Sequence, residues 1–307
     1  MRKIILLFFS TLLFAISNQK IVFDNYISKL SFSKNYLAVA LENGDVVIKN
    51  FKNFKNIYTI HLPKIEDFMG DKIAMPVYSL DLQNNKLLIL AGGEDNSKIV
   101  FIFDIKTKKL DKIINTNDSL MRAKFIKDKI LFAYLSDEIS LYDIKTKKYL
   151  YKTQIGNYVF STWSVKNNIV AIGDESGDIK IADIFSGKKL MIIKGFNKDQ
   201  TLSLDMYKNL IINGSSDKRV AIYDMKTKSS IIEMKAKFLP YGATITKNKF
   251  AFSFNDKNDI ALYDFNKKMR LLKGHTMALN GMKFIDDKTL ISYSPAEILI
   301  WKIDGKN

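Results

Sequence analysis

The residue types that most often carry chemistry are scarce in this chain. It contains two histidines, His61 and His275, and no cysteine among its 307 residues. Transition-metal centres in proteins draw mainly on thiolate and imidazole ligands, so this supply disfavours a dedicated metal site. The lack of cysteine also excludes disulfides, iron–sulfur ligation and covalently attached c-type haem.

The common catalytic motifs are missing as well. The sequence holds no Gly-rich phosphate loop, no G-x-S-x-G and no H-E-x-x-H. The segment 173–178, GDESGD, faintly resembles a calcium-binding loop, but it lacks the bidentate glutamate at the twelfth loop position. A tight turn is the favoured interpretation. We therefore expect no catalytic residue, no metal site and no cofactor.

The formal net charge of +16 raises the question of a polyanionic partner. Only four of the 48 basic residues are arginines: Arg2, Arg122, Arg219 and Arg270. Proteins that read nucleic acids rely on arginine for bidentate and stacking contacts. A composition rich in lysine and poor in arginine predicts no nucleic-acid partner.

The first seventeen residues are typical of a secretory signal peptide. MRK is a positively charged start, 4–16 is an apolar stretch, and AIS at 15–17 places small residues before a cleavage site. The alternative is an uncleaved membrane anchor, but the apolar stretch is shorter than the roughly 20 residues that span a bilayer. We expect cleavage after Ser17. Without a cysteine for lipid attachment, the product should be a soluble periplasmic protein with no stable membrane anchor.

The remainder, residues 18–307, is built from a repeat. Nearly the same phrase recurs as FDIKTKKL, YDIKTKKYL, ADIFSGKKL and YDMKTKSSI. Its anchoring aspartates are spaced by 39, 40, 41 and 40 residues, at Asp104, Asp143, Asp183, Asp224 and Asp264. Further copies around Asn50 and Lys302 bring the number of units to seven, with an insertion of about fourteen residues between the first two.

Each unit is predicted to contain four short strands. In 201–233, four runs rich in Ile, Val, Leu and Tyr alternate with KN, SDK and KTK turns. Four strands per forty residues, repeated radially, predict an all-β, seven-bladed β-propeller. The last unit stops after its third strand, so we expect the spare N-terminal strand at 20–26 to pair with it and close the ring. The DIKTKK segments are predicted hairpin turns, with a phosphate- or lipid-binding patch as the alternative.

The aromatic–Asp endings of the third strands resemble those of WD40-type propellers, and the resemblance covers roughly residues 19–307. The matching residues are Phe103 and Asp104, Tyr142 and Asp143, Tyr223 and Asp224, Tyr263 and Asp264, with Trp301 in the last unit. One Gly-His start is present, Gly274 and His275, and the other units lack it. We expect His275 to form a hydrogen bond within the final blade, to Ser292.

The insertion at 61–77 is the feature that departs most from the repeat. It falls in a fourth-to-first strand connection, on the face where turn carboxylates are expected to gather, whereas turn lysines gather on the opposite face. An apolar loop with methionines in such a position suggests a protein contact, and a lid over the central channel is the alternative. The predicted partner-binding residues are Glu66, Asp67, Phe68, Met69, Asp71, Met75, Glu94 and Asp95.

These expectations favour a non-catalytic, monomeric interaction protein of the periplasm. The export signal, length, degenerate repeat and lack of cysteine resemble accessory proteins of the NapL type, which are encoded with some periplasmic nitrate reductases. That resemblance implies nitrate reductase subunits as partners and a role in maturation or electron delivery. Two alternatives remain: a quinoprotein-type propeller enzyme, because ADIFSGKKLM resembles its docking repeat, and an outer-membrane assembly scaffold.

Overall fold

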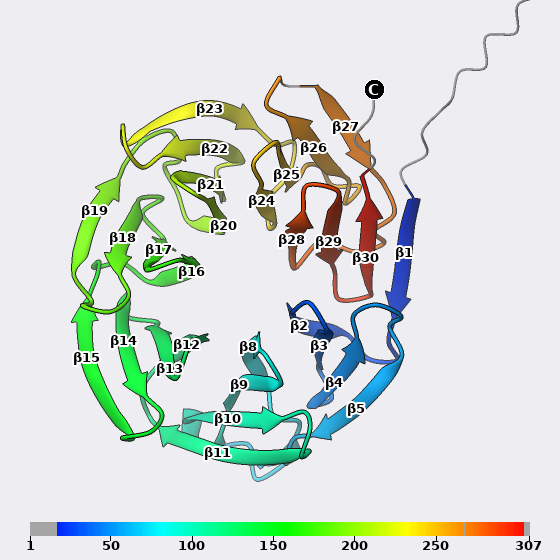
Figure 1. The fold of residues 1–307 in the computed structure, drawn as a ribbon, viewed down its shortest axis with the longest axis vertical. Coiled ribbons are helices and arrows are strands. Elements are labelled where there is room, and N and C mark those ends of the chain that lie inside the picture. The colour runs from blue at the N-terminus through cyan, green and yellow to red at the C-terminus, as the bar shows by residue number, and fades with distance from the viewer. Residues whose placement is uncertain (1–16, 267, 304–307) are drawn as a thin grey trace, which may run out of the picture.

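The computed structural model describes residues 17–266 and 268–303, which form a ring of seven four-stranded antiparallel sheets (Figure 1). The predicted seven-bladed, all-β propeller is therefore confirmed. Within the described part of the chain, no helix has the length and hydropathy needed to span a membrane. The proposed signal peptide lies outside the described residues, apart from the backbone of Ser17.

The strands follow one another from the channel to the rim in each of the first six blades. Blades 1 to 3 comprise β2 (Ile27–Phe32), β3 (Tyr36–Leu41), β4 (Asp45–Asn50) and β5 (Asn56–His61); β8 (Val77–Gln83), β9 (Lys86–Gly92), β10 (Lys98–Asp104) and β11 (Lys109–Thr116); and β12 (Leu120–Ile126), β13 (Lys129–Tyr134), β14 (Glu138–Asp143) and β15 (Lys148–Gln154). Blades 4 to 6 comprise β16 (Phe160–Lys166), β17 (Ile169–Asp174), β18 (Ile179–Asp183) and β19 (Lys189–Ile193); β20 (Thr201–Tyr207), β21 (Leu210–Ser215), β22 (Arg219–Asp224) and β23 (Ser229–Lys235); and β24 (Ala243–Ile245), β25 (Lys249–Ser253), β26 (Ile260–Asp264) and β27 (Met269–Leu272).

Blade 7 joins the two ends of the chain. It consists of β28 (Gly281–Asp286), β29 (Thr289–Tyr293) and β30 (Glu297–Lys302), with β1 (Ser17–Val22) as its outer strand. β1 is antiparallel to β30, in a register that runs from Ser17 opposite Lys302 to Val22 opposite Glu297. The strand begins and ends earlier than the predicted 20–26, because Asp24 and Asn25 lie in a bend that leads into β2. Cleavage after Ser17 would leave the other residues of β1 in place.

The core is divided among the blade interfaces. Successive residues of a strand point to opposite sides of its sheet, and here both sides are buried. In β3, Leu37 and Val39 pack towards blade 7, whereas Ala38 and Ala40 pack towards blade 2. Seven hydrophobic clusters of this kind occur among the described residues, one between each pair of neighbouring blades.

The repeated turns have the predicted structure. The carboxylate of Asp104 accepts hydrogen bonds from the backbone amides of Lys106 and Thr107, at 3.0 and 2.9 Å. Asp143, Asp183 and Asp224 bind the amides of their own turns in the same way. The turn then needs a residue with positive φ, which is Lys108, Lys147 or Lys228 in three blades and Gly187 in the fourth. The repetition of the phrase therefore follows from turn geometry.

The predicted hydrogen bond of His275 is present. Its Nε2 lies 2.7 Å from Ser292 Oγ, and the indole nitrogen of Trp301 donates to the same oxygen at 2.8 Å. On the other side, His275 Nδ1 lies 3.0 Å from the carboxylate of Glu297. Burial alone would raise the pKa of Glu297, but hydrogen bonds from Thr276, Ser294 and His275 lower it to about 2. This network fixes β29 against β30 inside blade 7.

Removing β1 should destabilise the whole ring. A chain that begins at Phe23 loses the pairing with β30 and the buried side chain of Ile21. At about 1 kcal/mol per lost hydrogen bond and about 2 kcal/mol for Ile21, its free energy of unfolding should fall by at least about 4 kcal/mol. Denaturant unfolding of this chain and of one that begins at Asn18 measures the difference. Equal midpoints and slopes would show that closure through β1 does not hold the ring together.

Candidate functional site: the insertion hairpin

The insertion forms a small hairpin between blades 1 and 2. Its strands are β6 (Ile65–Glu66) and β7 (Lys72–Ile73), which pair antiparallel. Leu62, Ile65 and Met75 at its base belong to the hydrophobic cluster between these two blades, and Met75 is only 2% exposed. The prediction that Met75 contacts a partner is therefore wrong, because its side chain is part of the core. Its apolar context, IAMPV, was a signal for burial that Met69, in DFMGD, does not have.

The tip of the hairpin presents two apolar side chains to solvent. Phe68 is 97% exposed and Met69 is 74% exposed. Asp67 stabilises the turn, because its carboxylate accepts hydrogen bonds from the backbone amides of Met69 and Asp71, both at 2.9 Å. Gly70 supplies the positive φ (86°) that the turn requires. Asp67 is thus a structural residue of the tip, although it was predicted as part of the contact surface.

A groove separates the hairpin from the connection between β9 and β10. That connection contains the short 3₁₀ helix η1 (Glu94–Asn96), and the carboxylate of Glu94 lies 3.5 Å from the amide of Glu66. The groove has a volume of about 290 Å³ and is lined by Glu66, Asp67, Phe68 and Asp95 among others. Lys98 lies on its wall, with its ammonium 4.7 Å from the ring centre of Tyr78.

The structure therefore brings seven of the eight predicted residues together. Glu66, Phe68, Met69, Asp71, Glu94 and Asp95 are exposed around the hairpin and η1, Asp67 is partly buried in the turn, and Met75 lies beneath. We call the six exposed residues the hairpin surface. The central channel is lined by strands and not by residues 61–77, so the described structure offers no support for a lid.

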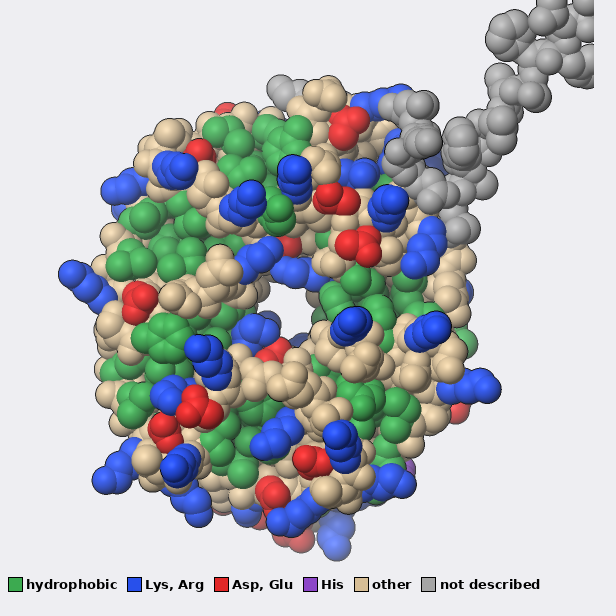
Figure 2. All heavy atoms as spheres, viewed as in Figure 1, with side chains coloured by type: hydrophobic (Ala, Val, Ile, Leu, Met, Phe, Trp, Pro, Cys, Tyr) green, Lys and Arg blue, Asp and Glu red, His purple; other side chains and the backbone are tan. Residues whose placement is uncertain are grey.

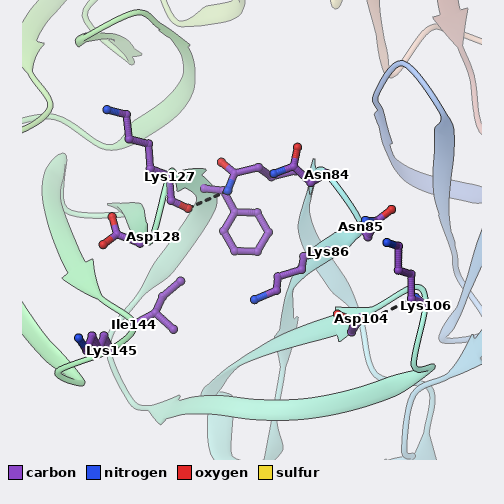
Figure 3. Close-up of a pocket in the computed structure, with 11 residues that line it drawn as sticks. Asn84, Asn85, Lys86, Asp104, Lys106, Lys127, Asp128, Ile144 and Lys145 are labelled. Carbon is purple, nitrogen blue, oxygen red and sulfur yellow. Dashed lines mark hydrogen bonds between the residues drawn. The ribbon is translucent and has the colours of Figure 1, made fainter.

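The opposite face has a hollow of about 950 Å³ between blades 2 and 3. Lys86, Lys106, Lys127 and Lys145 line it, and Figure 3 shows these side chains spread apart rather than converging on one point. Asp104 and Asp128 lie among them, so this face has mixed charge (Figure 3). The sequence prediction of a basic face overlooked the turn aspartates.

A buried charge cluster that the sequence did not reveal lies between blades 3 and 4. Lys180 forms an ion pair with Asp174, and its ammonium lies 4.0 Å from Asp137. Asp137 is fully buried, and neither of its carboxylate oxygens has a hydrogen-bond partner among the described residues. The GDESGD segment thus forms a tight turn, in agreement with the favoured interpretation. Its Asp174 is paired with Lys180.

Comparison with known proteins shows the fold and no more. No family model matches the chain, and no curated protein does. The crystal structure of Ika8, a computationally designed protein, matches with a TM-score of 0.68 at 16% sequence identity, covering 92% of this chain and 98% of Ika8. The likeness is one of fold alone. Because 1731 chains of solved structures match, the architecture does not discriminate among functions.

The buried Asp137 should make stability depend on pH in a definable way. Burial raises its pKa to about 6, against the opposing effects of Lys180 and Lys189. An aspartate in an unfolded chain titrates near 3.9, so the folded protein holds this proton more tightly. The resulting stabilisation is complete below about pH 4 and is lost as the pH rises through about 6.

Asp137→Asn should remove this dependence without backbone strain, since asparagine tolerates the positive φ (62°) of the position. The melting temperature of this variant minus that of the parent protein should increase from pH 5 to pH 7. Asp95→Asn, at another position of positive φ but exposed, is the control. A difference between Asp137→Asn and the parent that stays constant over this range would contradict the assignment.

Proposed function

We propose that this protein is a non-catalytic interaction protein of the periplasm, and that it binds a protein partner through the hairpin surface. The observation that carries the proposal is the nearly complete exposure of Phe68 on a hairpin whose base is buried. Burying a phenylalanine side chain is worth about 1.5–3 kcal/mol, and a turn held by Asp67 and Gly70 loses little entropy on binding.

The chemistry of this surface defines the partner. Phe68 and Met69 need an apolar pocket, and Glu66, Asp71, Glu94 and Asp95 around them need basic side chains at the rim of that pocket. Apolar anchors at the centre supply most of the affinity, whereas charges at the rim set orientation and association rate. A monomer with a single such hairpin would bind one copy of the partner.

The more specific assignment is a WD40-like accessory protein of the NapL type, exported by residues 1–17, with periplasmic nitrate reductase subunits as partners. The hydrogen bonds that join His275, Ser292 and Trp301 support the WD40-like part. The export-signal sequence supports the compartment. The protein would assist maturation or electron delivery without a cofactor of its own.

The test is a binding measurement with matched surface variants. Phe68→Asp combined with Met69→Asp should weaken capture of the partner at least about 100-fold, since two anchors each contribute more than about 1.4 kcal/mol. The melting temperature should not change, because neither side chain is buried. Replacing all of 64–75 is a poorer test, since it would remove Ile65 and Met75 from the core.

Leu150→Asp is the matched control, since Leu150 is 52% exposed on the rim strand of another blade. Reversal of Lys106, Lys108 and Lys109 to Glu controls for the opposite face. If the lysine reversal abolishes capture and the Phe68 and Met69 changes do not, the hairpin is not the binding surface. Mass spectrometry of the captured protein separately tests for nitrate reductase subunits, and their absence would overturn the accessory assignment while leaving the hairpin test intact.

A further inference from the structure

One strand of each blade lies innermost, around the central channel (Figure 1). Side chains from all seven blades line this channel. Figure 2 shows the channel open at the centre of the ring, with Lys and Arg side chains around its mouth. A cavity of about 310 Å³ lies within it. This volume is at the lower end of the ~300–1,000 Å³ that is usual for small-ligand sites.

The charged residues that line this cavity are both positive. They are Lys29 of β2 and Arg122 of β12, which come from blades 1 and 3, and no aspartate or glutamate among the described residues lines the cavity with them. Polar side chains that can donate hydrogen bonds complete the wall, among them Ser161, Thr162, Tyr241 and Tyr293. The cavity therefore combines excess positive charge with hydrogen-bond donors.

Neither cation is neutralised by the described protein. Lys29 Nζ donates to the carbonyl of Ser28 at 3.2 Å, and Arg122 Nη1 donates to the carbonyl of Met121 at 2.9 Å. Within the part of the chain that the structure describes, hydrogen bonds to protein atoms engage only Nη1 of the guanidinium. The other guanidinium donors are left for a ligand.

Other lysines of the inner strands provide a comparison. Lys124, two residues after Arg122, pairs with Asp81 at 2.7 Å, and Lys283 of β28 pairs with Asp205. These lysines are compensated within the ring, and the aspartates also bind backbone amides of the next blade. Among the described residues that line the cavity, by contrast, Lys29 and Arg122 have no such carboxylate partner.

This excess has an energetic cost in the ligand-free protein. Burial, and to a lesser extent the positive charge of Arg122, lower the pKa of Lys29 to about 8. Burial also lowers the pKa of Arg122. Two cations that lose hydration on burial and repel each other are stabilised by an anion placed between them.

We propose that the central channel binds a small oxyanion, of the phosphate or dicarboxylate class, between Arg122 and Lys29. The planar guanidinium forms paired hydrogen bonds to such oxygens, and the ammonium of Lys29 adds a second positive charge from blade 1. Channel walls of low dielectric strengthen both contacts. The site does not depend on the hairpin surface or its partner.

Isothermal titration calorimetry of the purified protein at low ionic strength tests this, with inorganic phosphate, sulfate and succinate as separate probes. At least one probe should bind saturably with one site per chain. Arg122→Gln and Lys29→Gln should each weaken that binding by about tenfold or more, since each removes a charge-assisted contact. The probe that binds best then distinguishes the phosphate class from the dicarboxylate class.

Lys106→Gln changes the net charge equally but lies on an exposed turn, so it is the control. Both channel variants relieve repulsion and should melt no lower than the parent; if one of them fails to fold, the other carries the test. The proposal is overturned if no probe binds saturably, or if Lys106→Gln weakens binding as much as the channel variants do.

Discussion

The pairing of β1 with β30 is the constraint on which the rest of the structure depends. It connects the two ends of the chain within blade 7, and the chain then passes directly into the innermost strand of blade 1. Ile21 of β1 joins the cluster between blades 7 and 1, where it packs with residues such as Ile27 and Ile298. Because each of the other interfaces is already formed by consecutive blades, this one contact converts an open series of sheets into a ring without free ends.

The two functional features follow from that closure. A closed ring fixes seven inner strands around one axis, so Lys29 and Arg122 are held close to each other although they are far apart in sequence. It also gives the hairpin a rigid base, because Leu62, Ile65 and Met75 are packed between two blades that cannot separate. The exposed Phe68 and the unpaired channel cations are both unfavourable in isolation. A ring that buries its core elsewhere can tolerate them at two surfaces where a partner or an anion would compensate them.

Much of the fold could be predicted because the repeat arises from hydrogen bonds between residues that are close in sequence. The turn aspartates at Asp104 and Asp143 accept hydrogen bonds from amides two or three residues away, so their spacing gives the repeat length, and the copies at Asn50 and Lys302 complete the blade number. The candidate site was harder to predict from the sequence. The sequence interpretation grouped Met69 with Met75, although Met69 stands in the turn segment DFMGD and Met75 in the apolar segment IAMPV, and the structure shows that Met75 is the buried one. The approach of Lys180 to Asp137 and the shared position of Lys29 and Arg122 depend on contacts between blades, which a repeat pattern in one dimension does not specify.

Amide hydrogen exchange in β30 tests the central claim of a closed ring most directly. In a closed ring, β30 is flanked by β1 and β29, as the third strands β10, β14 and β22 are flanked in their own blades. The account predicts that amides of β30 exchange as slowly as those of these three strands, through global unfolding alone. Exchange of β30 at the rate of outer strands such as β15 and β19 would mean that β1 detaches in the native state, and would contradict the account.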